Sequence, residues 1–296
     1  MKLCLGTVQF GLNYGIQGNG QPQEEKAFEM LSYAIDNGIE VFDTASAYGE
    51  AEKVLGDFFR TYPEVLDKIG VVSKLKPDAF KKGKEEHWGE IAVQNAKESL
   101  IRLGIKRFTA YLFHNAAYIF SEKAVKALYE VKTAGLTERI GVSIYTPEEA
   151  MKALDYSQIE AIQIPYNLFD HRLDKCGFFE KAEEKGVLVF ARSSLLQGLA
   201  VMDPDNLPDR VSFAKSYIDQ FRDICRRFNE PCLKTAIGYV GGKSGINYVV
   251  FGVDNIKQLK EYISIKDKQL PDEMIETIDQ EFRNVEERLV NPVLWK

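Results

Sequence analysis

Short apolar runs alternate along the chain with longer segments in which apolar residues recur every three or four positions. The short runs predict β-strands, and the longer segments predict amphipathic α-helices. We expect strands at residues 3–6, 39–42, 69–72, 109–113, 139–142, 161–164, 187–190 and 248–251. We expect helices at residues 23–37, 49–61, 89–102, 121–134, 147–154, 177–185, 212–229, 231–241, 255–263 and 272–288. Glycines follow several of these helices where a left-handed C-terminal cap is common, namely Gly38, Gly104, Gly135 and Gly186.

Strands that alternate with helices eight times imply parallel pairing through right-handed crossovers. A closed eight-stranded barrel and an open doubly wound sheet both satisfy this alternation. The count of eight, and the lack of a GxGxxG motif after the first strand, favour an α/β fold of the (β/α)₈ TIM-barrel type. No linker-like segment divides the 296 residues, so we expect a single domain over residues 1–296.

Composition and charge exclude several classes of function. With 38 basic and 44 acidic residues, the net charge of −6 argues against nucleic acid as the main partner. The sequence has no apolar stretch of 18 residues, so we expect no membrane span. The apolar run after Met1 and Lys2 is too short for the core of a signal peptide. Four cysteines without CxxC spacing and three scattered histidines predict free thiols, a cytoplasmic setting and no metal site.

Polar residues stand where the predicted strands end, which is the end of a TIM barrel that bears the active site. Asp43 ends the second strand, Lys74 the third and His114 the fourth, and Tyr48 lies in the loop after the second strand. Each has a structural alternative: Asp43 as a turn cap, Tyr48 as a packed rim aromatic, Lys74 as a solvated charge, and His114 as a hydrogen-bonded imidazole. Together, however, a lysine and an aspartate at adjacent strand ends would be costly to leave unpaired at an apolar barrel mouth.

These four residue types suit the reduction of a carbonyl group. The Tyr48 hydroxyl, with an ordinary pKa near 10, is a weak acid, and a cationic Lys74 at ~4 Å would stabilise its phenolate by about 4 kcal/mol before desolvation losses. Asp43 would hold Lys74 charged, and His114 would position the carbonyl oxygen. The hydride must come from a cofactor, because no side chain supplies one.

The residues around these positions resemble the signature of the aldo-keto reductases, in particular their shorter, bacterial-type members. The similarity covers residues 38–52 with 55–56, then 99–104, 111–114, 140–143, 163 with 166–167, and 196–199, in order. It implies an NAD(P)H-dependent oxidoreductase that reduces an aldehyde or ketone, or runs the reverse reaction, with Asp43, Tyr48, Lys74 and His114 as catalytic residues. Tyr48 would be the general acid.

The resemblance also implies positions that bind NADP(H) or NAD(H). These are Thr7, Ser143, Gln163, Arg192, Ser193, Leu195, Gln197, Gly198, Gly252, Asp254, Asn255, Gln258 and Glu261. Three positions depart from the family pattern. Ile144 replaces an asparagine that helps to hold the nicotinamide amide, and Arg192 stands where a tyrosine stacks on the nicotinamide. Asp254 stands where NADP-dependent members carry a basic residue, although Lys257 is close enough in sequence to compensate, so the choice between the two cofactors stays open.

Substrate contacts are expected from Tyr14, Asn115 and Tyr145, whose mixture of aromatic and hydrogen-bonding groups suits a sugar-like carbonyl. Two alternative functions remain. One is a lyase or isomerase on the same barrel that uses Lys74 as a Schiff base. The other is a nucleotide-binding redox sensor or regulatory relative without significant turnover. The pattern predicts neither the physiological substrate nor the oligomeric state.

Overall fold

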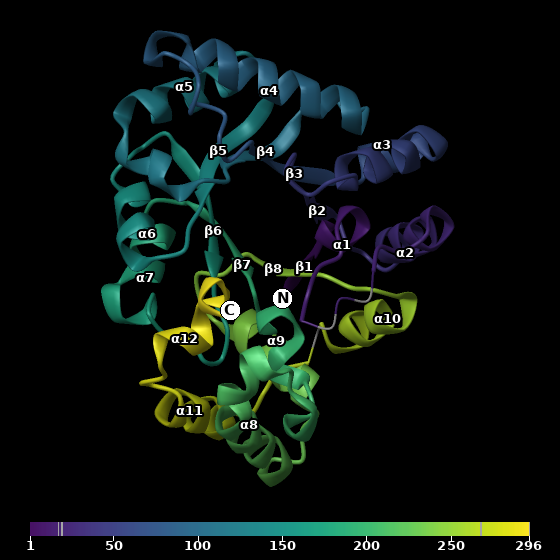
Figure 1. The fold of residues 1–296 in the computed structure, drawn as a ribbon, viewed down its shortest axis with the longest axis vertical. Coiled ribbons are helices and arrows are strands. Elements are labelled where there is room, and N and C mark those ends of the chain that lie inside the picture. Colours follow the sequence, from purple (N-terminus) through teal and green to yellow (C-terminus); the bar gives the residue numbers. More distant parts are fainter. Residues whose placement is uncertain (17, 19, 267, 296) are drawn as a thin grey trace.

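Eight parallel strands close into a barrel in the order β1 to β8, with helices around the outside (Figure 1). The computed structural model describes residues 1–16, 18, 20–266 and 268–295. The strands are β1 (Lys2–Gly6), β2 (Val41–Asp43), β3 (Gly70–Leu75), β4 (Phe108–Phe113), β5 (Thr137–Ser143), β6 (Ile159–Pro165), β7 (Leu188–Arg192) and β8 (Tyr248–Phe251). Each lies where the hydrophobic pattern predicts a strand, and β8 pairs with β1 to close the sheet. The prediction of a (β/α)₈ barrel instead of an open sheet is therefore confirmed.

The helices follow the predicted alternation. They are α1 (Val8–Gly11), α2 (Glu24–Asp36), α3 (Ala51–Thr61), α4 (Trp88–Leu103), α5 (Glu122–Thr133), α6 (Pro147–Leu154), α7 (Phe178–Glu184), α8 (Lys215–Arg227), α9 (Cys232–Gly242), α10 (Ile256–Ile265), α11 (Asp272–Glu281) and α12 (Glu287–Val290). Gly104 ends α4 with a φ of 67°, in the left-handed region, as predicted. Within the described ranges, every helix falls short of the length and apolar character needed to cross a bilayer.

Two predicted helices differ from the structure. The expected helix 272–288 is interrupted: α11 ends at Glu281, and α12 starts at Glu287. The Lys175 ammonium donates to the Arg283 carbonyl at 2.8 Å, and Phe282 packs edge-on against Phe169, so this segment bonds to the β6–α7 loop instead of continuing the helix. The expected helix 212–229 begins with a 3₁₀ segment, Asp209–Ala214, and is α-helical only over Lys215–Arg227.

The barrel interior explains where polar strand-end residues go. Alternate residues of the strands form one buried cluster, which consists of Cys4, Val41, Val72, Ala110, Leu112, Ala161, Phe190 and Val250. Because side chains alternate between the two faces of a strand, the residue two positions further along each strand also points inward. Asp43, Lys74, His114 and Arg192 hold these positions. The same alternation that builds the core therefore places polar groups at its C-terminal end.

Candidate active site

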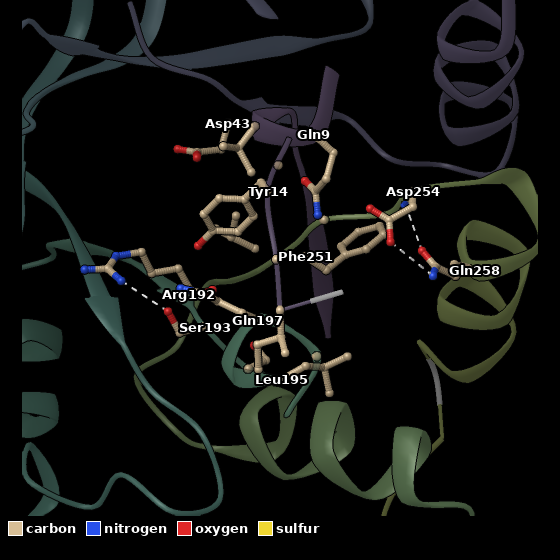
Figure 2. Close-up of a pocket in the computed structure, with 18 of the residues that line it drawn as sticks. Gln9, Tyr14, Asp43, Arg192, Ser193, Leu195, Gln197, Phe251, Asp254 and Gln258 are labelled. Carbon is tan, nitrogen blue, oxygen red and sulfur yellow. Dashed lines mark hydrogen bonds between the residues drawn. The ribbon is translucent and has the colours of Figure 1, made fainter. Parts of the chain in front are cut away.

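A cavity of about 610 Å³ opens at the C-terminal end of the barrel. Its lining includes the last residues of several strands, such as Gly6, Asp43 and Phe251. Figure 2 shows Asp43, Tyr14 and Arg192 on one side of the cavity and Asp254 with Gln258 on the other, with Phe251 between them. The cavity therefore has two chemically different ends, one at the barrel mouth and one at the start of α10.

A buried ion pair joins β2 and β3 at the barrel mouth. The Lys74 ammonium donates to Asp43 Oδ1 at 2.8 Å, to Asp43 Oδ2 at 2.9 Å and to the Thr44 carbonyl at 3.0 Å. Both side chains are almost completely buried. Burial by itself would lower the pKa of Lys74, but the charge of Asp43 and the contact with Tyr48 outweigh it, so the pKa lies above the ordinary value. Lys74 is therefore a permanent cation near neutral pH.

The Tyr48 hydroxyl lies next to this cation. Lys74 Nζ donates to Tyr48 Oη at 3.4 Å and lies 4.9 Å from the centre of the tyrosine ring. Burial raises the pKa of Tyr48 above 10, while the positive charge of Lys74 works in the opposite direction. The stabilisation of a phenolate that the sequence predicts is present, but desolvation is larger, and Tyr48 keeps its proton at neutral pH.

His114 faces Tyr48 across the cavity. The two rings meet edge to face with centroids 5.7 Å apart. Burial, together with the positive charges of Lys74 and Arg192, lowers the pKa of His114 to about 3. Its buried Nδ1 atom has no hydrogen-bond partner in the described part of the chain. His114 is therefore a neutral imidazole with spare hydrogen-bonding capacity at the cavity.

Two polar side chains continue the network across the barrel. Gln163 Nε2 donates to Asp43 Oδ1 at 2.7 Å, and Ser143 Oγ donates to Gln163 Oε1 at 3.2 Å. Ser143 lines the cavity, whereas Gln163 and Lys74 are fully buried outside the lining. The Gln163 side-chain amide thus orients Asp43.

Arg192 lies at the rim beside an exposed aromatic ring. Its guanidinium lies 4.6 Å from the centre of the Tyr145 ring and donates to the Ile144 carbonyl at 2.9 Å and to Ser193 Oγ at 3.1 Å. Tyr14 and Tyr145 also line the cavity and are 40% and 45% exposed. The rim therefore combines one hydrogen-bonded cation with two exposed aromatic side chains.

Most of the residues that the resemblance implies for cofactor binding line the same cavity. They are Thr7, Ser143, Arg192, Ser193, Leu195, Gln197, Gly198, Gly252, Asp254, Gln258 and Glu261. Asn255 lies outside the lining. Its side chain caps α10 by accepting a hydrogen bond from the backbone amide of Gln258 at 3.0 Å. Asn115, expected at the substrate, instead donates to the Pro77 carbonyl at 3.2 Å and also lies outside the lining.

The cavity has lining residues that sequence reasoning did not identify. Gln9 lies on the one-turn helix α1, Ser194 follows β7, and Tyr262 stacks on Phe251 at 4.5 Å to form a wall. A signal existed for Ser194, because it lies two residues after the end of β7. Gln9 and Tyr262 lacked such a signal, since each lies on a helix whose position depends on distant contacts.

The lining fits an elongated ligand with many hydrogen-bonding groups. Gln9 Oε1, His114 Nδ1 and Ser194 Oγ are buried without a partner among the described residues, and all three belong to residues that line the cavity. Buried polar atoms are normally satisfied, so these are candidate ligand contacts. A Cβ atom at Gly252 would lie 2.4 Å from the Gln9 amide, so glycine keeps this part of the cavity open.

Comparisons with known proteins bear on the family and the fold. The Aldo/keto reductase family model matches residues 2–281. An aldo-keto reductase of Gibberella moniliformis is 27% identical over 91% of this chain and 87% of its own length. A probable pyridoxal reductase of Schizosaccharomyces pombe is 25% identical over 85% of this chain and 79% of its own. The crystal structure of a putative aldo-keto reductase from Pseudomonas aeruginosa superposes with a TM-score of 0.66 at 22% identity, covering 89% of this chain and 88% of that one.

Proposed function

The chain belongs to the aldo/keto reductase family, and we propose that it reduces an aldehyde or ketone to the alcohol with NAD(P)H, using Tyr48 as the proton donor. The observation that supports this most directly is the hydrogen-bonded series from Asp43 through Lys74 to Tyr48. An ammonium group has only donors, so the Tyr48 oxygen accepts from Lys74. The hydroxyl hydrogen of Tyr48 is then available to a carbonyl oxygen in the cavity.

The state of His114 supports the same division of roles. An imidazole whose pKa is about 3 has no extra proton to give at neutral pH. It is still able to donate one hydrogen bond. We therefore assign His114 to positioning the carbonyl oxygen and Tyr48 to protonating it, while Asp43 keeps Lys74 charged and in place.

The cofactor would supply the hydride to the carbonyl carbon. Ser143 and Gln163 would hold the nicotinamide end beside Tyr48. The Gln163 side-chain amide, which donates a hydrogen bond to Asp43, would then also have to bind the cofactor. Ser194, Gly198 and Gly252 also line the cavity, as do Gln258 and Glu261 on α10. A bound dinucleotide would exclude water from the Asp43–Lys74 pair, which strengthens the effect of its charges on Tyr48.

For the substrate we propose a small polar carbonyl compound of sugar-like character. Tyr14 and Tyr145 each bring an aromatic ring and a hydroxyl group to the rim, and Arg192 adds a cation there. Sugars bind through this combination of aromatic stacking and hydrogen bonding. A long hydrocarbon aldehyde would form no hydrogen bond with either tyrosine hydroxyl group at this rim.

The experiment that tests the proposal is the substitution Tyr48→Phe. It removes the donated proton but keeps the ring, so we expect turnover to fall at least a hundredfold while the Kd for cofactor stays within threefold of wild type. Turnover is followed by cofactor oxidation with a panel of aldehydes, and affinity by fluorescence titration. Tyr129→Phe makes the same chemical change on the exposed surface of α5 and serves as the control. Wild-type turnover in Tyr48→Phe would refute the assignment, and a wild-type protein that binds cofactor without oxidising it would favour the redox-sensor alternative.

A further inference from the structure

We propose that Cys225 and Cys232 form a reversible disulfide when the protein is exposed to a hydroperoxide, with Cys232 reacting first and Cys225 completing the bond. Both are free thiols in the structure, as are Cys4 and Cys176. Neither Cys225 nor Cys232 lines the active-site cavity, so this chemistry is independent of the proposed reductase function.

The two cysteines lie where one helix ends and the next begins. Cys225 belongs to the last turn of α8, and Cys232 is the first residue of α9. The two helices pack against each other (Figure 1). Between them the chain turns at Asn229, whose φ of 54° lies in the left-handed region, and the Glu230 amide donates to the Cys225 carbonyl at 2.9 Å. The turn therefore brings Cys232 back to the end of α8.

The side chains of the two cysteines meet in this turn. Their thiol groups form a hydrogen bond with each other. Cys225 is 2% exposed and belongs to the apolar core, whereas Cys232 is half-buried and packs against that core. One sulfur atom is therefore shielded, and a small solute reaches the other. Cysteines that point apart cannot be bridged without backbone movement, and these two already face each other.

The surroundings of Cys232 favour its thiolate form. The hydrogen bond from Cys225 lowers the pKa of Cys232 to about 7; burial opposes this shift, and the positive charge of Arg222 adds to it. The N-terminus of α9 places a further partial positive charge at the same position. Because the thiolate is the nucleophilic form of cysteine, Cys232 is the residue of this pair that attacks an oxidant near neutral pH.

The carboxylates near this turn are already paired. Glu230 accepts from the Lys234 ammonium at 2.6 Å, and Asp203 lies 3.4 Å from the Arg222 guanidinium. Arg222 therefore divides its charge between Asp203 and the Cys232 sulfur, and the remaining attraction still favours the thiolate.

Cys225 has the complementary character. Its hydrogen bond with Cys232 and its burial both raise the pKa of Cys225 above the ordinary value. Cys225 thus keeps its proton and donates it towards the neighbouring sulfur. A protonated, shielded thiol of this kind reacts poorly with solutes, but it is in place to attack a sulfur atom that has been oxidised beside it.

Two steps convert the pair into a disulfide. In the first, the Cys232 thiolate attacks one oxygen of hydrogen peroxide, the O–O bond breaks, and Cys232 becomes a sulfenic acid while the released hydroxide takes up a proton to give water. In the second, the Cys225 sulfur attacks the Cys232 sulfur, and the hydroxyl group leaves as water with the Cys225 proton. The two sulfur atoms lose two electrons in total, and the peroxide gains them.

Cys176 provides a comparison within the same chain. It is half-buried like Cys232, but its thiol donates to the Leu173 carbonyl at 3.3 Å, and burial raises the pKa of Cys176. Exposure to solvent is thus similar at the two positions, while the thiolate is favoured only at Cys232. Iodoacetamide should therefore alkylate Cys232 at least tenfold faster than Cys176.

The test is oxidation of the full chain with hydrogen peroxide, followed by alkylation of the remaining thiols and mass spectrometry of tryptic peptides. Trypsin cleaves after Arg226 and Arg227, so a disulfide between Cys225 and Cys232 joins two otherwise separate peptides. We expect this linked pair in the wild-type protein and its loss on treatment with dithiothreitol.

Three variants assign the roles. Cys225→Ser should stop at a sulfenic acid on Cys232, which dimedone traps, and Cys232→Ser should give neither the disulfide nor the dimedone adduct at this turn. Cys176→Ser removes a thiol of similar exposure and should leave the disulfide unchanged. Absence of the linked peptides in oxidised wild type would overturn the proposal, as would a disulfide between two molecules in their place. Alkylation of Cys176 as fast as Cys232 would also overturn it.

Discussion

At the scale of single residues, the protonation states at the barrel mouth depend on their neighbours more than on residue type. Lys74 is completely buried, yet its pKa is raised because Asp43 and Tyr48 accept its hydrogen bonds. His114 faces the Tyr48 ring, and burial, together with the positive charges of Lys74 and Arg192, lowers its pKa to about 3. The sequence predicts that these residue types meet, but it does not reveal how deeply each is buried.

This depressed pKa makes a prediction about acid stability. Above pH 6.5 His114 is neutral in both the folded and the unfolded state and contributes no pH dependence. As the pH falls from 6.5 towards 3, only the unfolded chain takes up the proton, so folding stability is lost over that window. The loss from this residue between pH 7.5 and pH 5 should be about 2 kcal/mol.

The measurement is the free energy of unfolding by urea at pH 7.5 and pH 5 for wild type and His114→Gln. Glutamine is a polar side chain of similar size that does not titrate. We therefore expect the unfolding free energy of His114→Gln to fall by about 2 kcal/mol less than that of wild type between the two pH values. All other ionisable groups are common to the two proteins and cancel in the difference. An identical loss in both would show that His114 is protonated as easily in the folded state as in the unfolded one.

At the scale of elements, a second buried carboxylate fixes β3 against α3 and α4. Glu52 on α3 is 2% exposed and accepts hydrogen bonds from Ser73 Oγ at 2.7 Å and from Arg102 Nε at 2.8 Å. Arg102 in turn donates to Ser99 on α4. Because Ser73 directly precedes Lys74, this network helps to determine where the Lys74 end of β3 lies.

The network predicts an asymmetry between its two charges. Arg102→Met leaves the Glu52 charge buried with only Ser73 as a partner, and we expect a loss of about 3 kcal/mol in unfolding free energy. Glu52→Gln should cost less, because Arg102 is 38% exposed and is able to turn its charge towards water. The double variant Glu52→Leu, Arg102→Met should regain much of the loss. Urea unfolding of the three variants gives the comparison, and equal costs for both single variants would contradict the argument.

The elements that sequence reasoning placed well are those whose pattern is local. β4 is defined by a local, almost continuous apolar run, and α5 by its own amphipathic repeat and the Ser121 cap. The interruption after Glu281 depends instead on Lys175, which lies more than one hundred positions earlier. A periodicity computed within one window contains no information about such a partner.

At the scale of the whole molecule, the sequence predicts the position of site residues that end a strand. It does not predict the position of site residues on a loop that folds back over the barrel. Asp43, Lys74 and Ser143 belong to the first group. Tyr14 belongs to a loop whose position depends on two long-range contacts, from the Ile16 amide to the Gln197 carbonyl at 3.4 Å and from Arg210 to the Ile16 carbonyl at 3.0 Å. Aromatic and polar composition pointed to Tyr14, but only the fold shows which wall of the cavity it forms.

A ligand in this cavity would connect parts of the chain that are far apart in sequence, because the lining runs from Gly6 to Tyr262. Binding should therefore stabilise the barrel as a unit instead of one loop. At one hundred times its Kd, a dinucleotide adds about 2.7 kcal/mol to the stability of the folded state. For a chain of this size we expect a rise of about 5 °C in Tm, within a single transition.

Differential scanning fluorimetry over a range of NADH concentrations measures this effect. Each further tenfold increase in concentration should add about 1.4 kcal/mol, so the rise in Tm should grow with the logarithm of concentration and show no plateau. A new second transition would mean that part of the barrel unfolds independently of the ligand. An unchanged Tm at concentrations that saturate the fluorescence titration would mean that NADH binds the unfolded chain equally well, which a cavity assembled from both halves of the barrel does not allow.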